Sequence, residues 1–380
     1  MIRIGFLRHY SEEWVGGVNY IKNLLCALHS LHDQTIQPIV FVSKETKPWI
    51  RESFSPYARI VETSLLDRNS LNWRIWQKTK QIFDSDIWVS IVLFKYKVNV
   101  FSHSNLYRTF FTKTLNWIPD FQHLYLPDLF TPNEIENRNY SFAKIAQKSD
   151  LVILSSNDAF ADFKAFSPEF YNKGRILRFV AQPEQKLINN DQNLENKILE
   201  KYGLIRTEFF YLPNQFWQHK NHKVAFEALA LLKQKNKNLT LVCSGKMSDY
   251  RNQNHIQSLK EFIKANDLDI RLLGMIEYDD VIVLMKKSIA VINPSLFEGW
   301  SSTVEECKVI GKSLILSEIP VHREQNPANS VYFDPNNAVE LAAILELFLT
   351  QKRTPPSPIN LEQETENFAL NYMAIVKSLI

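Results

Sequence analysis

The sequence predicts an α/β protein made of two domains that face a cleft. Nearly continuous apolar runs alternate with segments of helical periodicity from one end of the chain to the other, which is typical of α/β architecture. The runs show no polar alternation, which indicates strands buried on both faces of a parallel sheet. The chain has 380 residues, enough for two domains of usual size.

The first domain is predicted to span residues 1–183. A helical stripe that includes Tyr20 and Leu24 follows its first strand, and Gly16 and Gly17 stand just before that stripe. Backbone amides at a helix start can bind an anion, although a bare Gly-Gly pair is more often a turn. The strands expected in this domain are residues 3–8, 38–43, 98–102, 115–118, 151–155 and 176–180.

A polar stretch rich in Asn and Gln predicts a linker over residues 184–206, which runs into a short helix. A second domain is expected over residues 207–360, and a Pro-rich break at 355–358 ends it. A last helix near 365–380 is expected to pack back on the first domain. The strands expected in the second domain are residues 209–212, 239–244, 270–273, 289–293 and 313–317.

Composition and charge exclude several classes of protein. A net charge of +3 gives no sign of the basic surface that binds nucleic acids. The start of the chain has no signal-peptide layout, and the best apolar run, residues 86–94, is far too short to span a bilayer. The acidic triplet 84–86 precedes this strand-like run instead of following one, so we discount it as a metal–nucleotide site. Cys26, Cys243 and Cys307 show no ligand or redox spacing and are interpreted as core residues of a cytosolic protein.

Two glutamates eight positions apart, Glu298 and Glu306, stand in the crossover between the last two predicted strands. Glu298 lies in the loop at the C-terminal end of a strand, where ligands bind in open α/β sheets. Helical spacing places Glu306 within the buried arc of the next helix and Glu305 toward solvent. A buried carboxylate needs partners, so Glu306 is either a ligand-binding group or a structural ion-pair residue.

Polar residues also follow two other predicted strands. Lys220 stands at a helix start, where it is either a clamp for phosphate oxygens or a solvated loop lysine. Asp120 and His123 follow a strand of the first domain, where either could reach across a cleft, although a lone histidine among aromatics is more often a core group. His219 and His222 lack the nearby carboxylate or cysteine that a metal site needs.

Four segments, in one order, resemble the family-four retaining glycosyltransferases, whose GT-B fold has two Rossmann-like domains facing a cleft. The strongest is FEGWSSTVEECKVIGKSLILSEIPVHREQ at 297–325; the others are GGVNYIKNLLCAL near the N-terminus, LPNQFWQHKNH, and LLGMI at 272–276. The resemblance covers most of the chain. It implies a nucleotide-sugar donor whose sugar hydroxyls are held by Glu298 and whose ribose hydroxyls are held by Glu306.

The same resemblance implies roles for further residues. Lys220 and helix-start amides would stabilise the leaving diphosphate, and Asp120 or His123 would line the acceptor side. The catalytic residues that it implies are Glu298, His123, Asp120 and Lys220. The donor-binding residues that it implies are Gly16, Gly17, Asn214, Lys220, Met275, Ile276, Glu298, Trp300, Ser301, Ser302, Thr303 and Glu306.

The sequence departs from the family pattern at three places. Asn214 stands where family members usually carry an arginine, six positions before the clamp lysine, so one positive charge on the diphosphate is missing. Ser301 replaces a glycine of the family's EGFG turn. The family's histidine in the first domain aligns with either Asp120 or His123, and the sequence leaves this choice open.

The resemblance implies a retaining enzyme that moves a hexose-type sugar to a glycan or lipid-linked acceptor in bacterial surface polysaccharide or lipopolysaccharide synthesis. We expect no metal or other cofactor, no nucleic-acid partner, and a cytoplasmic location with peripheral contact at the inner face of the membrane. An inactive GT-B-like sugar-nucleotide-binding or scaffold protein is the alternative that Asn214 keeps open. A nicotinamide oxidoreductase is disfavoured because the G-x-G-x-x-G fingerprint is missing.

Overall fold

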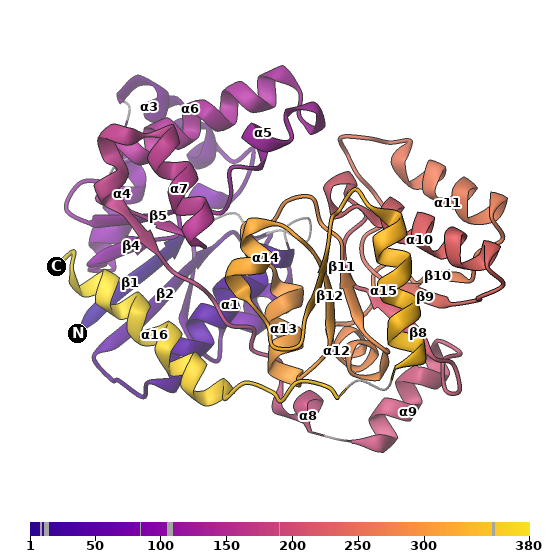
Figure 1. Ribbon diagram of the computed structural model, residues 1–380. Helices are drawn as coiled ribbons and strands as arrows, with labels where there is room; N and C mark the ends of the chain where they lie inside the picture. The colour runs from indigo at the N-terminus through magenta and orange to yellow at the C-terminus, as the bar shows by residue number, and fades with distance from the viewer. Residues whose placement is uncertain (8–9, 11–14, 84, 105–108, 190, 352–353) are drawn as a thin grey trace. The chain divides into compact units, whose positions relative to one another are not determined.

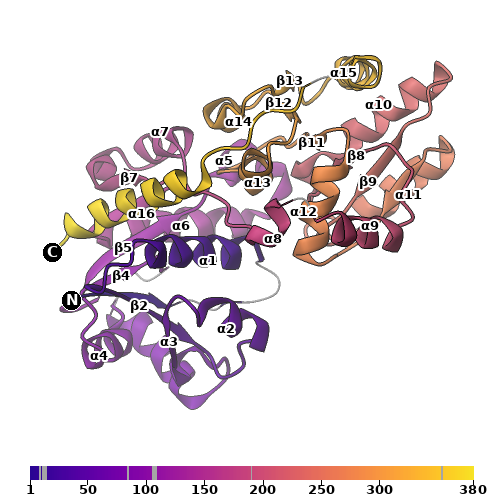
Figure 2. The same cartoon turned by 90° about the horizontal axis from the view of Figure 1, so that it is seen from below.

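The computed structural model describes residues 1–380 except 8–9, 11–14, 84, 105–108, 190 and 352–353. The chain forms two compact α/β units, each built around one parallel sheet with helices on both faces (Figures 1 and 2). The first unit comprises Met1–Leu124, Thr131–Val180 and Glu362–Ile380, and the second comprises Tyr125–Phe130 and Ala181–Leu361.

The first unit has a seven-stranded parallel sheet in the order β3-β2-β1-β4-β5-β6-β7. Its strands are β1 Ile2–Leu7, β2 Ile36–Val42, β3 Arg59–Glu62, β4 Val100–Ser102, β5 Lys113–Ile118, β6 Leu151–Leu154 and β7 Gly174–Ile176. Its main helices are α1 Val15–Ser30, α2 Pro48–Phe54, α3 Leu71–Phe83, α4 Ile87–Lys95, α5 Gln122–Tyr125, α6 Pro132–Lys148, α7 Asn157–Phe166 and the last helix, α16 Leu361–Lys377. The hydroxyl of Tyr372 on α16 donates to Ser102 Oγ at the end of β4 (2.7 Å), which fixes the last helix to this sheet.

The second unit has a six-stranded parallel sheet in the order β10-β9-β8-β11-β12-β13. Its strands are β8 Phe209–Leu212, β9 Thr240–Cys243, β10 Ile270–Leu272, β11 Val291–Asn293, β12 Leu314–Ser317 and β13 Val331–Phe333. Its helices are α8 Gln185–Ile188, α9 Gln192–Lys201, the 3-10 turn η5 Gln218–Lys220, α10 His222–Gln234, α11 His255–Ala265, α12 Tyr278–Lys287, α13 Ser302–Ile310, α14 Pro320–Gln325 and α15 Ala338–Thr350.

Strand β8 shows why the apolar runs are continuous. Phe210 and Leu212 pack into the hydrophobic core on one face of the sheet, and Phe209 and Tyr211 pack into a second core on the other face. Because successive side chains of a strand point to opposite faces, a strand covered on both sides must be apolar at every position.

The order of this sheet reverses between β8 and β11. From β8 the chain winds outward to β9 and β10, and from β11 it winds in the other direction to β12 and β13. In folds of this kind, ligands bind in a crevice beside the carboxyl ends of the strands at which the order reverses, which here are β8 and β11.

The predicted α/β class, with its parallel sheets, is confirmed, and each predicted strand is present within a few residues. Strands β3 and β13 were not predicted. Residues 86–94 do not form a strand: Ile87 begins helix α4, and Asp84 of the acidic triplet lies outside the described residues.

Gly16 and Gly17 belong to the first turn of α1 instead of preceding it. Cys243 and Cys307 are buried as predicted, whereas Cys26 is only partly buried.

Residues 184–206, predicted as a linker, carry α8 and α9 and belong to the second unit. The reason lies in a buried ion pair. Glu195 of α9 is almost fully buried, and its carboxylate contacts Lys286 Nζ (2.8 Å) and Lys287 Nζ (2.7 Å) of α12. Polar composition suggested an open linker, but these charges hold α9 on the second unit.

Candidate functional site

The loops after β8 and β11 are tied together by the residues around Lys220. Asn221 adopts a left-handed conformation (φ 54°) between η5 and α10, and its side-chain amide donates to the carbonyls of Pro294 (3.2 Å) and Pro335 (2.8 Å). The Leu296 amide donates to the carbonyl of His219 (2.8 Å). The position of Lys220 is therefore fixed by backbone contacts on both sides of the crevice.

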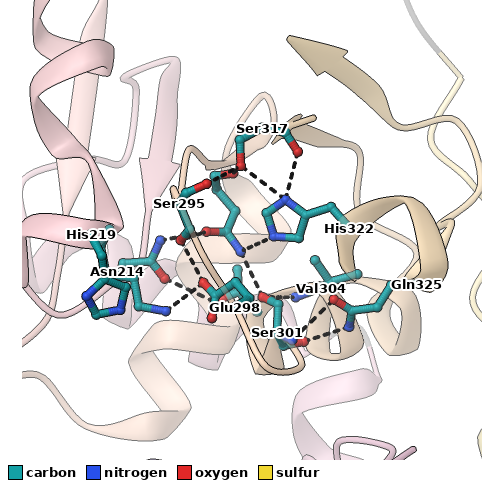
Figure 3. A network of polar contacts seen from close by, with 12 residues as sticks. Asn214, His219, Ser295, Glu298, Ser301, Val304, Ser317, His322 and Gln325 are labelled. Carbon is teal, nitrogen blue, oxygen red and sulfur yellow. Dashed lines mark hydrogen bonds and ion pairs between the residues drawn. The ribbon is translucent and has the colours of Figure 1, made fainter. Parts of the chain in front are cut away.

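Lys220 and Glu298 form an ion pair across this crevice (Figure 3 shows Glu298 and its neighbours). Lys220 Nζ lies 2.6 Å from Glu298 Oε1, and the two side chains are 16% and 9% exposed. The Ser295 hydroxyl donates to the same carboxylate oxygen (2.6 Å). Burial alone would raise the pKa of the Glu298 carboxyl, but the Lys220 ammonium and the Ser295 hydroxyl outweigh it and hold that pKa below its usual value. Glu298 is therefore ionised at neutral pH.

Asn293, at the carboxyl end of β11, organises the polar groups beside this pair (Figure 3). Its amide nitrogen donates to Ser301 Oγ (2.8 Å), and its oxygen accepts from Ser295 Oγ (2.9 Å) and Asn214 Nδ2 (2.9 Å). Thr303 Oγ1 donates to Asn214 Oδ1 (3.4 Å). Asn214, which replaces the family's arginine, is thus a buried link between the loops and carries no charge to a ligand.

The start of α13 is held by Ser301 and Gln325. Ser301 caps the helix by accepting from the Val304 amide (3.4 Å), and its own amide donates to Gln325 Oε1 (3.2 Å). The amides of Ser301 and Val304 are therefore engaged within the protein. Trp300 precedes the cap and is partly buried. Ser302 and Thr303 lie in the first turn of α13, and backbone amides in a first turn have no partner within the helix.

The prediction that Glu306 is buried is confirmed, but the prediction for Glu305 is wrong. Glu305 is only 1% exposed; it accepts from Gln325 Nε2 (2.9 Å) and pairs with Lys308 Nζ (3.1 Å). Helical spacing within α13 could not anticipate Gln325, because that residue comes from α14. Burial raises the pKa of the Glu306 carboxyl to about 7, although a hydrogen bond from the Tyr278 hydroxyl opposes this rise.

Replacing Glu306 with glutamine is expected to change how stability depends on pH. Folding raises the pKa of the Glu306 carboxyl from its usual value of 4.5 to about 7. Its protonated form therefore stabilises the fold fully below about pH 4.5, and this stabilisation is lost as the pH rises through 7. Glu306→Gln removes the titration. The free energy of unfolding, measured by urea denaturation, should rise for the variant relative to the wild type by about 3 kcal/mol between about pH 4.5 and 8. A difference that does not vary with pH would contradict this.

Asp120 and His123 lie in the first unit, and Arg138 joins them. Arg138 Nη2 donates to Asp120 Oδ1 (2.6 Å), and Arg138 Nε donates to His123 Nδ1 (3.2 Å). Because arginine only donates, His123 Nδ1 accepts, so Nε2 carries the proton and donates to Asn139 Oδ1 (3.0 Å). Burial lowers the pKa of the His123 imidazole. His123 is thus a neutral, buried group, and Asp120 is a half-exposed, ion-paired carboxylate.

The remaining predicted donor residues fall in two places. Gly16 and Gly17 lie in the first turn of α1 in the first unit. Met275 is exposed and Ile276 partly buried in the turn that follows β10, and the Gly274 carbonyl of this turn accepts from the Gly245 amide (2.8 Å) after β9. Within the second unit, the structure brings together Asn214, Lys220, Glu298, Ser301 and Thr303 through the contacts described above.

Four buried residues of this network were not predicted: Asn293, Ser295, His322 and Gln325. A sequence signal existed for the first two, because a polar residue that closes an apolar run at a strand end lies at the crevice edge. His322 and Gln325 gave no such signal. His322 Nδ1 lies 2.9 Å from the Ser317 carbonyl and its Nε2 lies 3.4 Å from Asn293 Nδ2, so the ring links the end of β12 to Asn293.

Among the described residues, no group of three or more His, Cys, Asp or Glu side chains is arranged to hold a metal ion. His219 and His222 are both buried, and His222 stacks on Phe216 with ring centroids 4.1 Å apart. Burial lowers the pKa of His222 to about 3, so it is a neutral core residue. The described residues also include no helix long and apolar enough to cross a membrane.

Comparison with known proteins connects this geometry to a family. Residues 197–367 match the family model described as "Glycosyl transferases group 1". No curated protein matches the chain.

Several solved structures share the fold along the whole chain. Alr3699/HepE from Anabaena, in complex with UDP and glucose, is 14% identical with a TM-score of 0.64, covering 100% of this chain and 95% of that one. A glycosyltransferase from Rickettsia africae is 18% identical (TM-score 0.64, 100% and 94% covered). The lipopolysaccharide outer core galactosyltransferase WaaB is 13% identical (TM-score 0.61, 100% of both chains covered).

The matched residues contain β11, α13 and the loops that carry Lys220 and Glu298, so the family match and the polar crevice coincide. The likeness of the solved structures extends over both units. Residues 197–367 therefore match a group 1 glycosyltransferase domain, and the chain as a whole has the fold of GT-B glycosyltransferases.

Proposed function

We propose that this glycosyltransferase takes a hexose-type sugar from a nucleotide-sugar donor and transfers it, with retention of anomeric configuration, to a glycan or lipid-linked acceptor. The observation that carries the proposal is the Lys220–Glu298 pair, set at the carboxyl ends of β8 and β11 and next to the start of α13. It brings a cation and an ionised carboxylate close to the first turn of α13, groups that can hold a sugar diphosphate.

The proposed reaction breaks the bond between the sugar and the diphosphate. Negative charge then develops on the departing diphosphate, and the Lys220 ammonium with the amides of Ser302 and Thr303 would stabilise it. Glu298 would accept hydrogen bonds from hydroxyls of the donor sugar, and it also fixes the Lys220 ammonium in place. Glu306, which the Tyr278 hydroxyl contacts, would accept from the ribose hydroxyls.

The first unit would supply the acceptor. Asp120 is the better candidate for contact with an acceptor hydroxyl because its carboxylate is half-exposed, whereas both ring nitrogens of His123 are engaged. We assign His123 to positioning Arg138 and through it Asp120. A cytoplasmic place in bacterial surface polysaccharide or lipopolysaccharide synthesis fits such an enzyme. The lipopolysaccharide galactosyltransferase among the similar structures supports this context.

A nucleotide-sugar panel tests the proposal. Thermal unfolding is measured with UDP-glucose first, because a similar structure is described in complex with that compound, and then with other sugars and bases. A donor that binds the folded chain raises the unfolding temperature by mass action. Turnover of that donor, with NMR of the product's anomeric proton, then tests retention. Binding without turnover would favour an inactive sugar-nucleotide-binding protein, and no shift with any nucleotide sugar would refute the proposal.

Activity is expected to persist without divalent metal. The sequence has no credible acidic metal triplet at a strand end, and Lys220 would occupy the place where a cation would otherwise meet the diphosphate. Initial rates should stay within about twofold after treatment with a chelator such as EDTA and gel filtration. Complete loss of activity that manganese or magnesium restores would overturn this expectation.

A further inference from the structure

Helix α4 of the first unit is apolar on all sides but covered on only one. Val89 and Leu93 are fully buried in the hydrophobic core beneath it, together with Trp76 and Val98. The side chains of the other face are exposed: Trp88, Ile91 and Phe94. A helix with no polar face belongs in a core or against a partner, and no described residue of its unit covers this second face.

The segment that precedes β5 adds two aromatic rings to the same face. The Phe110 amide donates to Ser90 Oγ of α4 (2.9 Å), which pins this segment against the helix. The Phe111 ring lies 6.0 Å from the Phe94 ring and 6.4 Å from the Phe110 ring, between centroids. Phe94 is 68% exposed and Phe111 90% exposed, so the aromatic cluster faces outward. We call Trp88, Ile91, Phe94, Phe110 and Phe111 the α4 patch; α4 is labelled in Figures 1 and 2.

Phe111 is also held in a conformation that costs free energy. Its φ is +65°, the left-handed region that bulky residues rarely adopt, and the turn is closed by Thr109 Oγ1, which donates to the Thr112 carbonyl (2.7 Å). Strained residues persist where the surroundings hold them and concentrate at functional positions. Here the strain presents an aromatic ring to solvent.

The charged side chains at the C-terminal end of α4 are positive. Residues 87–119 contain no Asp or Glu, and of their lysines Lys113 is paired with Asp150. Lys95 and Lys97 are exposed at the C-terminal end of α4. Lys95 Nζ and the Arg59 guanidinium both lie over the Tyr96 ring, at 5.7 and 5.3 Å from its centroid. An exposed apolar surface next to exposed cations matches the boundary between the acyl chains and the headgroups of an anionic bilayer.

We propose that the α4 patch is the site at which this glycosyltransferase binds the surface of an anionic lipid bilayer. Trp88, Phe94 and Phe111 enter the interfacial layer, where aromatic side chains are favoured, and Lys95 and Lys97 contact the lipid phosphates. A second copy of the chain fits less well, because a self-complementary contact would bring these lysines together. The inference extends the proposed function, since a lipid-linked acceptor would be presented at such a surface.

Vesicle sedimentation tests the assignment with the full chain and no substrate. The wild type should bind vesicles of phosphatidylcholine with phosphatidylglycerol, bind vesicles of phosphatidylcholine alone more weakly, and lose affinity in high salt. The double variants Phe94→Ser/Phe111→Ser and Lys95→Glu/Lys97→Glu should each lower the partition coefficient about tenfold or more. Circular dichroism and the unfolding temperature check that each variant folds.

Matched substitutions elsewhere serve as controls. Val339, 66% exposed on α15, and Leu370, exposed on α16, are replaced together by serine, and exposed Lys260 and Lys264 of α11 together by glutamate. Both control variants should bind vesicles as the wild type does. A wild type that binds neither kind of vesicle, or patch variants that bind like the wild type, would refute the assignment. A concentration-dependent dimer that Phe94→Ser/Phe111→Ser abolishes would show that a second copy covers the patch instead.

The same variants separate this inference from the proposed function. Donor turnover is measured without membranes, by release of nucleotide. Loss of vesicle binding with unchanged turnover supports the bilayer site. Vesicle binding by a wild type that turns over no nucleotide sugar would support the bilayer site while refuting the proposed function. Equal loss of turnover in the patch variants and in their controls would refute a specific role for the patch.

Discussion

Replacing Lys220 with alanine is expected to lower the catalytic efficiency by roughly 30- to 1,000-fold. The figure follows from losing about 2 to 4 kcal/mol of transition-state stabilisation, as when a preorganised charge-stabilising donor is removed. No other cation is supplied at position 214, where the buried Asn214 side chain is committed to Asn293 and Thr303. Steady-state kinetics with the donor found in the nucleotide-sugar panel provide the measurement.

A second buried ion pair distinguishes loss of chemistry from loss of stability. Lys220→Ala leaves Glu298 without its counter-charge, which destabilises the folded state as well as the transition state. Lys286 is buried to a similar extent and pairs with Glu195 in the same unit, away from the crevice. Lys286→Ala should therefore lower the unfolding temperature but leave the efficiency of the folded fraction unchanged. If Lys220→Ala lowers efficiency by less than about threefold, the diphosphate rests on helix-start amides alone.

Replacing Glu298 with glutamine is expected to reduce transfer by about 10³-fold or more and to leave the fold intact. The amide has the shape of the carboxylate and can still accept from Ser295 and Lys220 through its oxygen, so the crevice keeps its form. The variant loses the negative charge that both orients Lys220 and receives the hydroxyls of the sugar. The rate constant at saturating donor, together with the unfolding temperature, is the measurement.

The control for this variant is Glu305→Gln. Glu305 is also buried and also pairs with a lysine, but that lysine is Lys308 of its own helix and not Lys220. It should retain transfer within a few-fold of the wild type. Full turnover by Glu298→Gln would show that the donor sugar does not depend on this carboxylate.

The sequence was sufficient to predict the parallel sheets, the position of Glu298 after a strand end and the burial of Glu306, for related physical reasons. Strands such as β8 are buried on both faces and must be apolar throughout, so each strand and its end are visible in the chain. A polar residue that follows such an end lies at the edge of the sheet, as Glu298 does. Glu306 could be assigned to the core because its own helix supplies the apolar neighbours, Val304 and Val309.

The errors arose where contacts came from distant parts of the chain. Glu305 is covered by Gln325, twenty residues away, and Glu195 is neutralised by lysines of α12, so local periodicity and composition misplaced both. Helix α4 looked like a strand in the sequence because its nine residues have apolar groups on every side and therefore show no helical period. The outer side of this helix is exposed but carries apolar residues, so the polar residues that would have shown a helical period are missing.

Asn221 constrains how this site can change during evolution. Glycine could adopt its left-handed backbone but would release the loops at Pro294 and Pro335, and aspartate would lose the donor that both carbonyls need. Other residues would meet steric strain at a φ of 54°. Drift at this position would displace its neighbour, Lys220, without touching a substrate. Selection for catalysis therefore extends to a residue whose side chain donates to two backbone carbonyls.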